Sequence, residues 1–335
     1  MDKILYFPYI NLPKTDWTVR TLLYYDNIGS IVPQEYFYSP ERSYEPFMLE
    51  LVRSGLVIPI DPIETLDYPW QICKPFLEFL QSPYFRINQK VESFSRGIES
   101  RIHIGKFSGA RIHADKFDGE IFYSLVQLGL ARRINNNWYM VEKNTAKYLM
   151  KFLASIISTK LEMLPTTDNY ESIPFRKPII EQKRKRDTIL SNLIPFPEEI
   201  DLKKLLKFKE KNHSTLKLFK NKIEQLVLDE NLIEGTQLFN AKIEELEIHK
   251  NELYNKMNES QFKNVFFGSV CGIIGATQGF VSTANTVGAV GGAMPGFASA
   301  IYSALKIEKA EDIADQTGMK YLALIDKRLR NNIKT

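Results

Sequence analysis

The feature that most constrains this chain is a run of 42 residues, 264 to 305, without a formally charged side chain. Protein surfaces in water are rich in charged residues, so such a run must be hidden from water. A polar segment, Ser282 to Thr286, divides it into Asn264–Val281 and Val287–Leu305. As a helix, each part is just long enough to approach the roughly 30 Å thickness of bilayer hydrocarbon. The sequence therefore predicts a shielded helical hairpin.

Eight glycines lie in this run, and most of them recur four residues apart. That spacing places small residues on one helical face, which allows two backbones to approach closely, as in membrane proteins. A glycine inside a helix costs about 1 kcal/mol relative to alanine, so their number requires a compensating contact. The glycines expected at a membrane or oligomerisation contact are Gly268, Gly272, Gly275, Gly279, Gly288, Gly292 and Gly296.

Polar residues and a proline, notably Gln278 and Pro295, weaken the signal for a permanent membrane span. Three alternatives stay open: permanent or conditional membrane association, a buried Gly/Ala hairpin within a soluble protein, and an oligomerisation stalk. They imply membrane lipid, a second copy of the chain, or another protein of the same system as partners.

Composition indicates a folded protein of about two domains, with 335 residues, 44% hydrophobic residues and 25% charged residues. The net charge of +4 is too small to imply a nucleic-acid partner by itself. Cys73 and Cys271 fit neither a disulfide framework nor a zinc-binding spacing. The first residues do not resemble a signal peptide. We therefore expect a cytoplasmic protein, with peripheral or conditional membrane association as an addition.

The N-terminal region predicts an α/β domain. Ile4–Ile10 and Ile28–Val32 are apolar segments typical of strands, and Asp16–Tyr25 between them has helical periodicity with Thr15 as its N-cap. A helix between two short apolar strands indicates a βαβ unit and a small sheet with parallel pairing.

An internal repeat follows, in which Leu51–Leu56 resembles Leu125–Leu130 and each copy has a glycine where a helix should end. The second copy continues into Ala131–Ile134, an Asn135–Asn137 turn and Trp138–Val141, which predict a β-hairpin. A helix followed by a hairpin resembles a winged-helix unit. From Asn144 an amphipathic helix is expected.

The expected fold class is α+β, with winged-helix-like helix-hairpin units in the N-terminal α/β domain and an all-α C-terminal region. The predicted divisions are residues 1–168, a proline-rich linker at 169–200, a long-helix hairpin at 201–260, and the Gly-rich hairpin with a charged helix at 261–335.

Charge separates the two helices expected at 201–229 and 236–258. Residues 176–222 carry 14 Lys/Arg against 6 Asp/Glu, a net +8, whereas residues 223–260 carry 3 against 9, a net −6. Antiparallel pairing would bring these opposite charges together, which favours an intramolecular helical hairpin.

Two short basic motifs are candidates for ligand contact. The repeats starting at Arg101 and Arg111 each place a histidine two residues and a lysine five residues later, so His103 and His113 could line an anion or proton-transfer site. Packing in a local hairpin explains the repeat equally well. Lysines and arginines of a loop and of the wing could contact phosphates, or form solvated surfaces: Lys183, Arg184, Lys185, Arg186, Arg132 and Arg133.

The sequence contains no Walker loop, dinucleotide-binding glycine fingerprint, nucleophile elbow or zinc-protease helix. We therefore expect no metal and no cofactor, and a non-enzymatic role is favoured over an enzyme with an unusual site.

Several segments resemble an uncharacterised bacterial protein family over roughly residues 1–230. They are Tyr6–Ile10 (YFPYI), Leu22–Asp26 (LLYYD), Ile31–Pro33 (IVP), and Trp138–Val141 before Thr145-Ala146. The resemblance implies a bacterial origin and a common N-terminal fold, and it transfers no catalytic residue.

The leading functional hypothesis is a sensor or effector protein. Its N-terminal domain would bind a partner, and its Gly-rich hairpin would mediate membrane association or oligomerisation, in antiphage defence or a stress response. The alternative is a soluble nucleic-acid-associated protein that uses the winged-helix-like unit and the basic loop.

Overall fold

A parallel sheet of four strands lies at the centre of the computed structural model, which describes residues 3–83, 85, 109–166, 186, 190, 202–229, 237–259 and 296–313. Its order is β3 (Val57–Ile60), β2 (Asn27–Ile31), β1 (Lys3–Tyr6) and β7 (Leu164–Thr166), and every neighbouring pair is parallel. Helix α1 (Asp16–Tyr24) connects β1 to β2, which confirms the predicted βαβ unit. Thr15 occupies the N-cap position, although its side chain makes no capping hydrogen bond.

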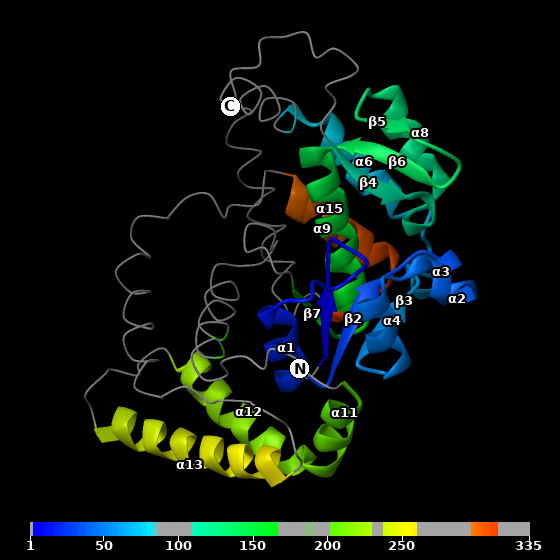
Figure 1. Ribbon diagram of the computed structural model, residues 1–335. Coiled ribbons are helices and arrows are strands. Elements are labelled where there is room, and N and C mark those ends of the chain that lie inside the picture. Colours follow the sequence, from blue (N-terminus) through cyan, green and yellow to red (C-terminus); the bar gives the residue numbers. More distant parts are fainter. Residues whose placement is uncertain are drawn as a thin grey trace, which may run out of the picture.

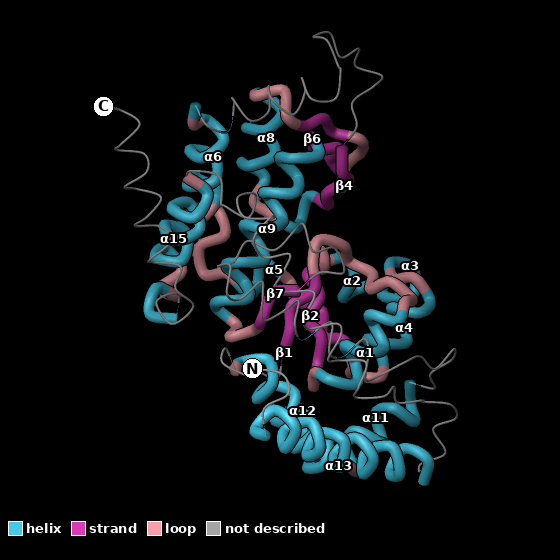
Figure 2. Tube along the Cα trace, turned by 90° about the vertical axis from the view of Figure 1, so that its left-hand side faces the viewer, coloured by secondary structure: helices cyan, strands magenta, loops and turns pink. Residues whose placement is uncertain are grey.

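The strands alternate strictly between two cores, one on each face of the sheet. Leu5 and Phe7 face the first core, whereas Ile4 and Tyr6 face the second, as expected from the two-residue period of a strand. A parallel sheet is normally covered on both faces, and Figure 2 shows how this is achieved. Helices lie on both sides of the sheet.

The links from β2 to the second sheet are short helices. They are α2 (Glu35–Tyr38), α3 (Pro40–Ser43), α4 (Pro46–Arg53), α5 (Pro62–Thr65) and α6 (Cys73–Gln81). The aromatic residues of α6 turn inward, and Phe76 and Phe79 are buried in the first core.

The second sheet is antiparallel, in the order β4 (Gly109–His113), β6 (Trp138–Glu142), β5 (Ala131–Arg133). A 3-10 turn, η2 (Ala114–Lys116), and helix α8 (Gly119–Gln127) connect β4 to β5. The predicted hairpin β5–β6 is confirmed. The fold class is mixed α+β, as the sequence predicted.

The two repeat copies end their helices in the same way. Gly55 and Gly129 have φ of 75° and 71°, the left-handed region that glycine enters without strain. In both copies the residue after the glycine donates its N–H to the carbonyl five residues earlier, Leu56 to Leu51 at 3.1 Å and Leu130 to Leu125 at 2.8 Å. This is the Schellman arrangement. The copies then diverge, because β3 joins the parallel sheet whereas β5 enters a hairpin, so the expected helix-hairpin unit forms only from the second copy.

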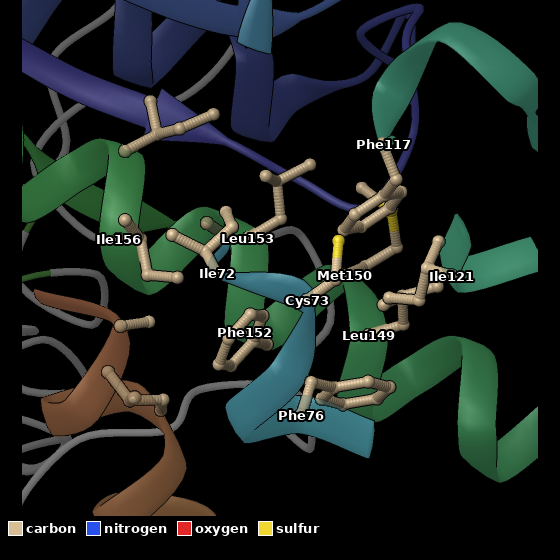
Figure 3. Packing of buried hydrophobic residues seen from close by; sticks show 14 of the residues in the cluster. Ile72, Cys73, Phe76, Phe117, Ile121, Leu149, Met150, Phe152, Leu153 and Ile156 are labelled. Atoms are coloured by element: carbon tan, nitrogen blue, oxygen red, sulfur yellow. The ribbon is translucent and has the colours of Figure 1, made fainter. Parts of the chain in front are cut away.

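Helix α9 (Lys143–Lys160) runs between the two sheets and is buried from Thr145 onward along most of its length. Its apolar side chains meet those of α6 and of the β4–β6 unit, and Figure 3 shows Phe152 near Phe76 and Cys73. Helix α15 (Phe297–Ile307) packs against both α6 and α9.

The opposite face of the sheet is covered by α1, α4 and three later helices, α11 (Leu202–Lys211), α12 (His213–Leu228) and α13 (Gln237–Glu259). The expectation of one helix over 201–229 is wrong, because the helix breaks at Asn212. Asn212 leaves the helical conformation, with φ of −114° and ψ of 25°, and its backbone N–H and side-chain amide both donate to the carbonyl of Phe208, at 2.9 and 3.1 Å.

Helices α12 and α13 lie side by side, so the predicted hairpin is confirmed (Figure 1). Lys222 of α12 pairs with Glu245 of α13, as the charge asymmetry predicted. Lys242 of α13 pairs with Asp229 beyond the end of α12, with 2.6 Å between Nζ and Oδ2.

A buried ion pair attaches α12 to the sheet side of the molecule. Arg186 contacts both carboxylate oxygens of Glu224, at 2.5 and 2.6 Å, and the Tyr24 hydroxyl donates to the same carboxylate. Arg186 is buried. The expectation that Arg186 belongs to a basic phosphate-binding loop is therefore wrong, because its guanidinium is already paired within the protein.

The Glu224→Gln variant tests this attachment. Burial acts to raise the pKa of the Glu224 carboxyl, but the hydrogen bonds and charge of Arg186 outweigh it and lower the pKa. We expect the variant to lower the free energy of unfolding by about 2 kcal/mol at pH 7, since one buried partner is lost. A carboxylate whose pKa is lower in the folded protein stabilises the fold fully at pH values above its pKa in the unfolded chain, roughly 4.3. That stabilisation is lost as the pH falls through the pKa of the folded protein.

Urea unfolding at pH 7 and pH 3 measures both effects. The difference between wild type and variant should be larger at pH 7 than at pH 3. Glu244→Gln on the exposed side of α13 is the matched control and should change neither value. An equal difference at both pH values would contradict the assignment.

Candidate functional site

A pocket of about 900 Å³ opens between the two sheets, beyond the carboxyl end of β1. Its walls are the loop that follows β1, the strands β4 and β6, and the first turns of α9. In parallel sheets, ligands bind beyond the carboxyl ends of the strands where the chain leaves neighbouring strands in opposite directions. β1 is such a strand, because β2 lies on one side of it and the much later β7 on the other.

The pocket lining is strongly cationic. Five basic residues line the pocket, but only one acidic residue, Glu45, does so. A cleft lined by charges of one sign concentrates the electrostatic field and attracts ions of the opposite sign. The arrangement therefore favours an anionic ligand. The basic residues are Lys14, Arg111, Lys116, Lys143 and Lys147.

Lys116 is the most unusual of these residues, because it is only 4% exposed. Burial lowers the pKa of its amine to about 7. Among the described residues, no hydrogen-bond acceptor or carboxylate is paired with this amine. A buried cation without a partner destabilises the fold, so its presence in a pocket indicates a binding role.

Asn11 presents a second unsatisfied group at the same pocket. Its side-chain oxygen is buried and has no hydrogen-bond partner within the described part of the chain. Native proteins leave few such atoms unpaired. The pocket thus holds one unpaired acceptor together with the Lys116 amine.

His113 is fully buried in the wall of the pocket, and within the described residues only its Nδ1 is hydrogen-bonded, since Nε2 has no hydrogen-bond partner. Its Nδ1 accepts from the Asp115 N–H at 3.2 Å, which assigns the proton to Nε2, and Nε2 lies 3.0 Å from Oε1 of Glu35. The Trp138 ring meets the imidazole edge-on at 4.9 Å. Glu35 also accepts from the Asn137 side chain at 3.1 Å. His113 of β4 therefore lies beside Glu35 of α2.

The predicted pairing of His103 with His113 cannot be followed, since His103 lies outside the described residues. The same holds for Lys183, Arg184 and Lys185 and for six of the predicted contact glycines: Gly268, Gly272, Gly275, Gly279, Gly288 and Gly292.

Gly296, the last predicted contact glycine, is the N-cap of α15 and has φ of 99°. The residues after it lie in the first core, where Phe297, Ile301 and Leu305 are buried. This end of the uncharged run packs inside the protein. Of the helices in the described ranges, none is long and apolar enough to cross a membrane.

Arg132 and Arg133 lie exposed on β5, outside the pocket. Arg133 donates to the carbonyls of Asn135 and Asn136 in the hairpin turn, at 3.0 and 3.3 Å. The neighbouring helix α8 contains no lysine or arginine, and Tyr123 on its outer face is 67% exposed. Helix α8 corresponds in position to the recognition helix of a helix-turn-helix protein, but it has no basic residue to contact DNA.

Cys73 is not a candidate nucleophile, because burial raises the pKa of its thiol to about 12. Within the described ranges, no group of three or more His, Cys, Asp and Glu side chains could hold a metal ion. The sequence interpretation missed the pocket residues Asn11 and Lys147. The available signal was the lysine three residues after His113, which is Lys116.

No protein-family model, curated protein or solved structure matches this chain. The resemblance to an uncharacterised bacterial family stays a prediction.

The Lys116→Met variant tests the cost of the buried amine. The folded protein binds fewer protons than the unfolded chain between pH 7 and about 10.4, so this lysine destabilises most at and below pH 7 and progressively less as pH rises. We expect the variant to raise the free energy of unfolding by roughly 2–4 kcal/mol at pH 7 and to have a smaller advantage at pH 9.5. Urea unfolding at both pH values measures it.

Lys207→Met is the matched control, since Lys207 is an exposed residue of α11. It should leave stability within experimental error of the wild type. Loss of stability in Lys116→Met would show that the amine has a stabilising partner in the fold.

Proposed function

We propose that this chain is a non-enzymatic sensor whose pocket binds an anionic ligand and whose Gly-rich segment responds by membrane association or self-association. The observation that carries the proposal is that one helix, α9, contributes to both regions. Lys143, Ala146 and Lys147 of its first turns line the pocket, and its later turns hold α15, the helix that ends the uncharged run.

The contact between α9 and α15 begins directly beside the pocket. Tyr148 packs edge-on against Phe297 at 5.0 Å, and Phe79 of α6 meets the same ring at 5.2 Å. A ligand that shifts the first turns of α9 would therefore alter the packing of the helix that follows the Gly-rich segment. Packed elements of this kind transmit coupling only when they have two arrangements, which the proposal requires of α15.

The far end of α15 is held by a buried carboxylate. Glu308 is fully buried in its side chain and accepts the backbone N–H groups of Asp67 and Tyr68 at 2.8 and 2.9 Å. Lys160, at the end of α9, donates to Glu308 at 2.8 Å and lies 2.8 Å from Asp67. Three donors on one carboxylate make a strong and releasable anchor.

The partners that fit this proposal are membrane lipid, a second copy of the chain, or a protein of the same system. Antiphage defence or a bacterial stress response is the setting in which a cytoplasmic sensor with a conditional membrane or oligomerisation segment would act.

The Glu308→Gln variant tests the anchor. It removes the charge that three donors share, which should weaken docking of α15 by about 2 kcal/mol and raise the undocked fraction roughly 30-fold. We expect faster proteolysis near residues 296–313, together with more self-association by light scattering or more dye release from phosphatidylethanolamine–phosphatidylglycerol vesicles. Glu244→Gln serves as the exposed control. If wild type and Glu308→Gln both stay monomeric and leave vesicles intact, the effector part of the proposal fails.

A nucleic-acid-associated protein is the alternative, and the exposed Arg132 and Arg133 on the hairpin favour it. The absence of cations on α8 and the pairing of Arg186 with Glu224 count against it. This alternative requires binding to duplex DNA that weakens steeply with salt and with the Arg132→Ala/Arg133→Ala double variant. DNA binding that depends neither on salt nor on Arg132 and Arg133 would rule out this alternative.

A further inference from the structure

We propose that the pocket beyond β1 binds a free nucleotide, with its phosphates at Lys116 and Arg111 and its ring among the aromatic side chains of the opening. The inference specifies the ligand of the sensor proposed above and rests on that function only in treating the pocket as the sensing site. Three properties of the pocket support it: unpaired polar groups, cationic lining and aromatic lining.

The unpaired groups define what the ligand must supply. The Lys116 ammonium needs an acceptor, and an anionic oxygen in a site shielded from water is the strongest one available. The Asn11 side-chain oxygen needs a donor such as a hydroxyl or an amino group. Inorganic phosphate satisfies the first need well and the second poorly. A nucleotide satisfies both, because it joins phosphate oxygens to sugar hydroxyls and, in most bases, an amino group.

The position of the cations identifies the phosphate end. Arg111 and His113 lie two residues apart on β4, so their side chains leave the same face of the strand, and Lys116 follows in the next turn. Lys143 and Lys147 are one helical turn apart on α9 and share a face of that helix. Cations from two elements thus converge on the pocket, as the negative charge of a di- or triphosphate requires.

The N-terminus of α9, which lies in the pocket wall, does not offer free N–H groups for binding phosphate. The Glu142 carboxylate already accepts the N–H groups of Asn144 and Thr145 at 3.0 and 2.8 Å, so the first amides of α9 are occupied. The loop between β1 and α1 contains no glycine, unlike the phosphate-binding turn of a dinucleotide fold. The phosphates must therefore be bound by lysine and arginine side chains.

Aromatic side chains line the rest of the pocket. Tyr9 is 63% exposed at the opening, and Tyr36, Phe47 and Trp138 form other parts of the lining. Planar bases stack on such rings regardless of their identity. The volume of about 900 Å³ lies within the range of small-molecule sites and suits one mono- or dinucleotide.

Isothermal titration calorimetry of the full chain with ATP, AMP, adenosine and inorganic pyrophosphate tests the inference. We expect ATP to bind at least tenfold more tightly than adenosine or pyrophosphate alone, since only ATP meets both sets of groups. A single-stranded adenine oligonucleotide tests whether the pocket prefers the terminal nucleotide of a nucleic-acid strand to a free nucleotide. Tighter binding of pyrophosphate than of ATP, or of the oligonucleotide than of ATP, overturns the proposal of a free nucleotide.

Two variants locate the site. Lys116→Met and Arg111→Met should each raise the dissociation constant for ATP at least tenfold, while Lys207→Met leaves it unchanged. Because unfolding measurements show independently whether Lys116→Met is folded, lost binding in a stable variant supports the site. Unchanged ATP affinity in both pocket variants overturns it.

Proton uptake gives a readout that a merely structural lysine would not produce. A bound phosphate raises the pKa of the Lys116 amine, so binding at pH 8 should take up protons, and the measured enthalpy should depend on the ionisation enthalpy of the buffer. Lys116→Met should abolish that dependence. Buffer-independent binding in the wild type contradicts the role of Lys116.

The outcomes separate this inference from the proposed function. Nucleotide binding with no effect on vesicle leakage or self-association leaves the ligand assignment standing and removes the effector response. Leakage or self-association after Glu308→Gln, in a chain that binds none of the nucleotides, supports the effector and overturns the ligand assignment.

Discussion

Burial of α9 between two sheets is the constraint on which the rest of the structure depends. A helix buried on nearly all sides must have apolar residues around its circumference or satisfy its polar side chains internally. Ser155 and Thr159 do the latter, donating at 2.7 Å to the carbonyls of Lys151 and Ser155 in the preceding turn. With its hydroxyls satisfied within the helix, α9 can contact the parallel sheet, the antiparallel sheet, α6 and α15 at once.

Two buried charged side chains are paired within the described part of the protein, and Lys116 contrasts with them. Arg186 is paired with Glu224, and Glu308 accepts from two backbone amides and Lys160. In each case removal of one partner would leave the other unpaired, so these contacts hold α12 beside α1 and the end of α15 beside α9. Lys116 has no such partner and faces a pocket instead of a packed core. This contrast supports the proposal that the pocket holds an anionic ligand.

The sequence predicted most features that depend on neighbouring residues. The βαβ unit, the β5–β6 hairpin, the helix ends at Gly55 and Gly129, and the charge-matched pair α12–α13 all follow from local periodicity and turn chemistry. The break at Asn212 was missed because the apolar periodicity continues across this one non-helical residue. The pocket was missed for a different reason. Asn11, Lys116 and Lys147 come from three separate elements, and only the tertiary fold brings them together.

The docked helix α15 changes how the uncharged run must be interpreted. The sequence alone treats residues 264–305 as two equivalent halves, each able to pack in lipid or in protein. The structure makes the end of the second half different, because Phe297, Ile301 and Leu305 already have protein partners and the chain after them is held at Glu308. Any membrane or oligomer contact that uses these residues must first release them from the core. Since that release costs buried apolar area, entry into lipid or self-association must bury the same side chains again, or another free energy such as ligand binding at the other end of α9 must favour the undocked state.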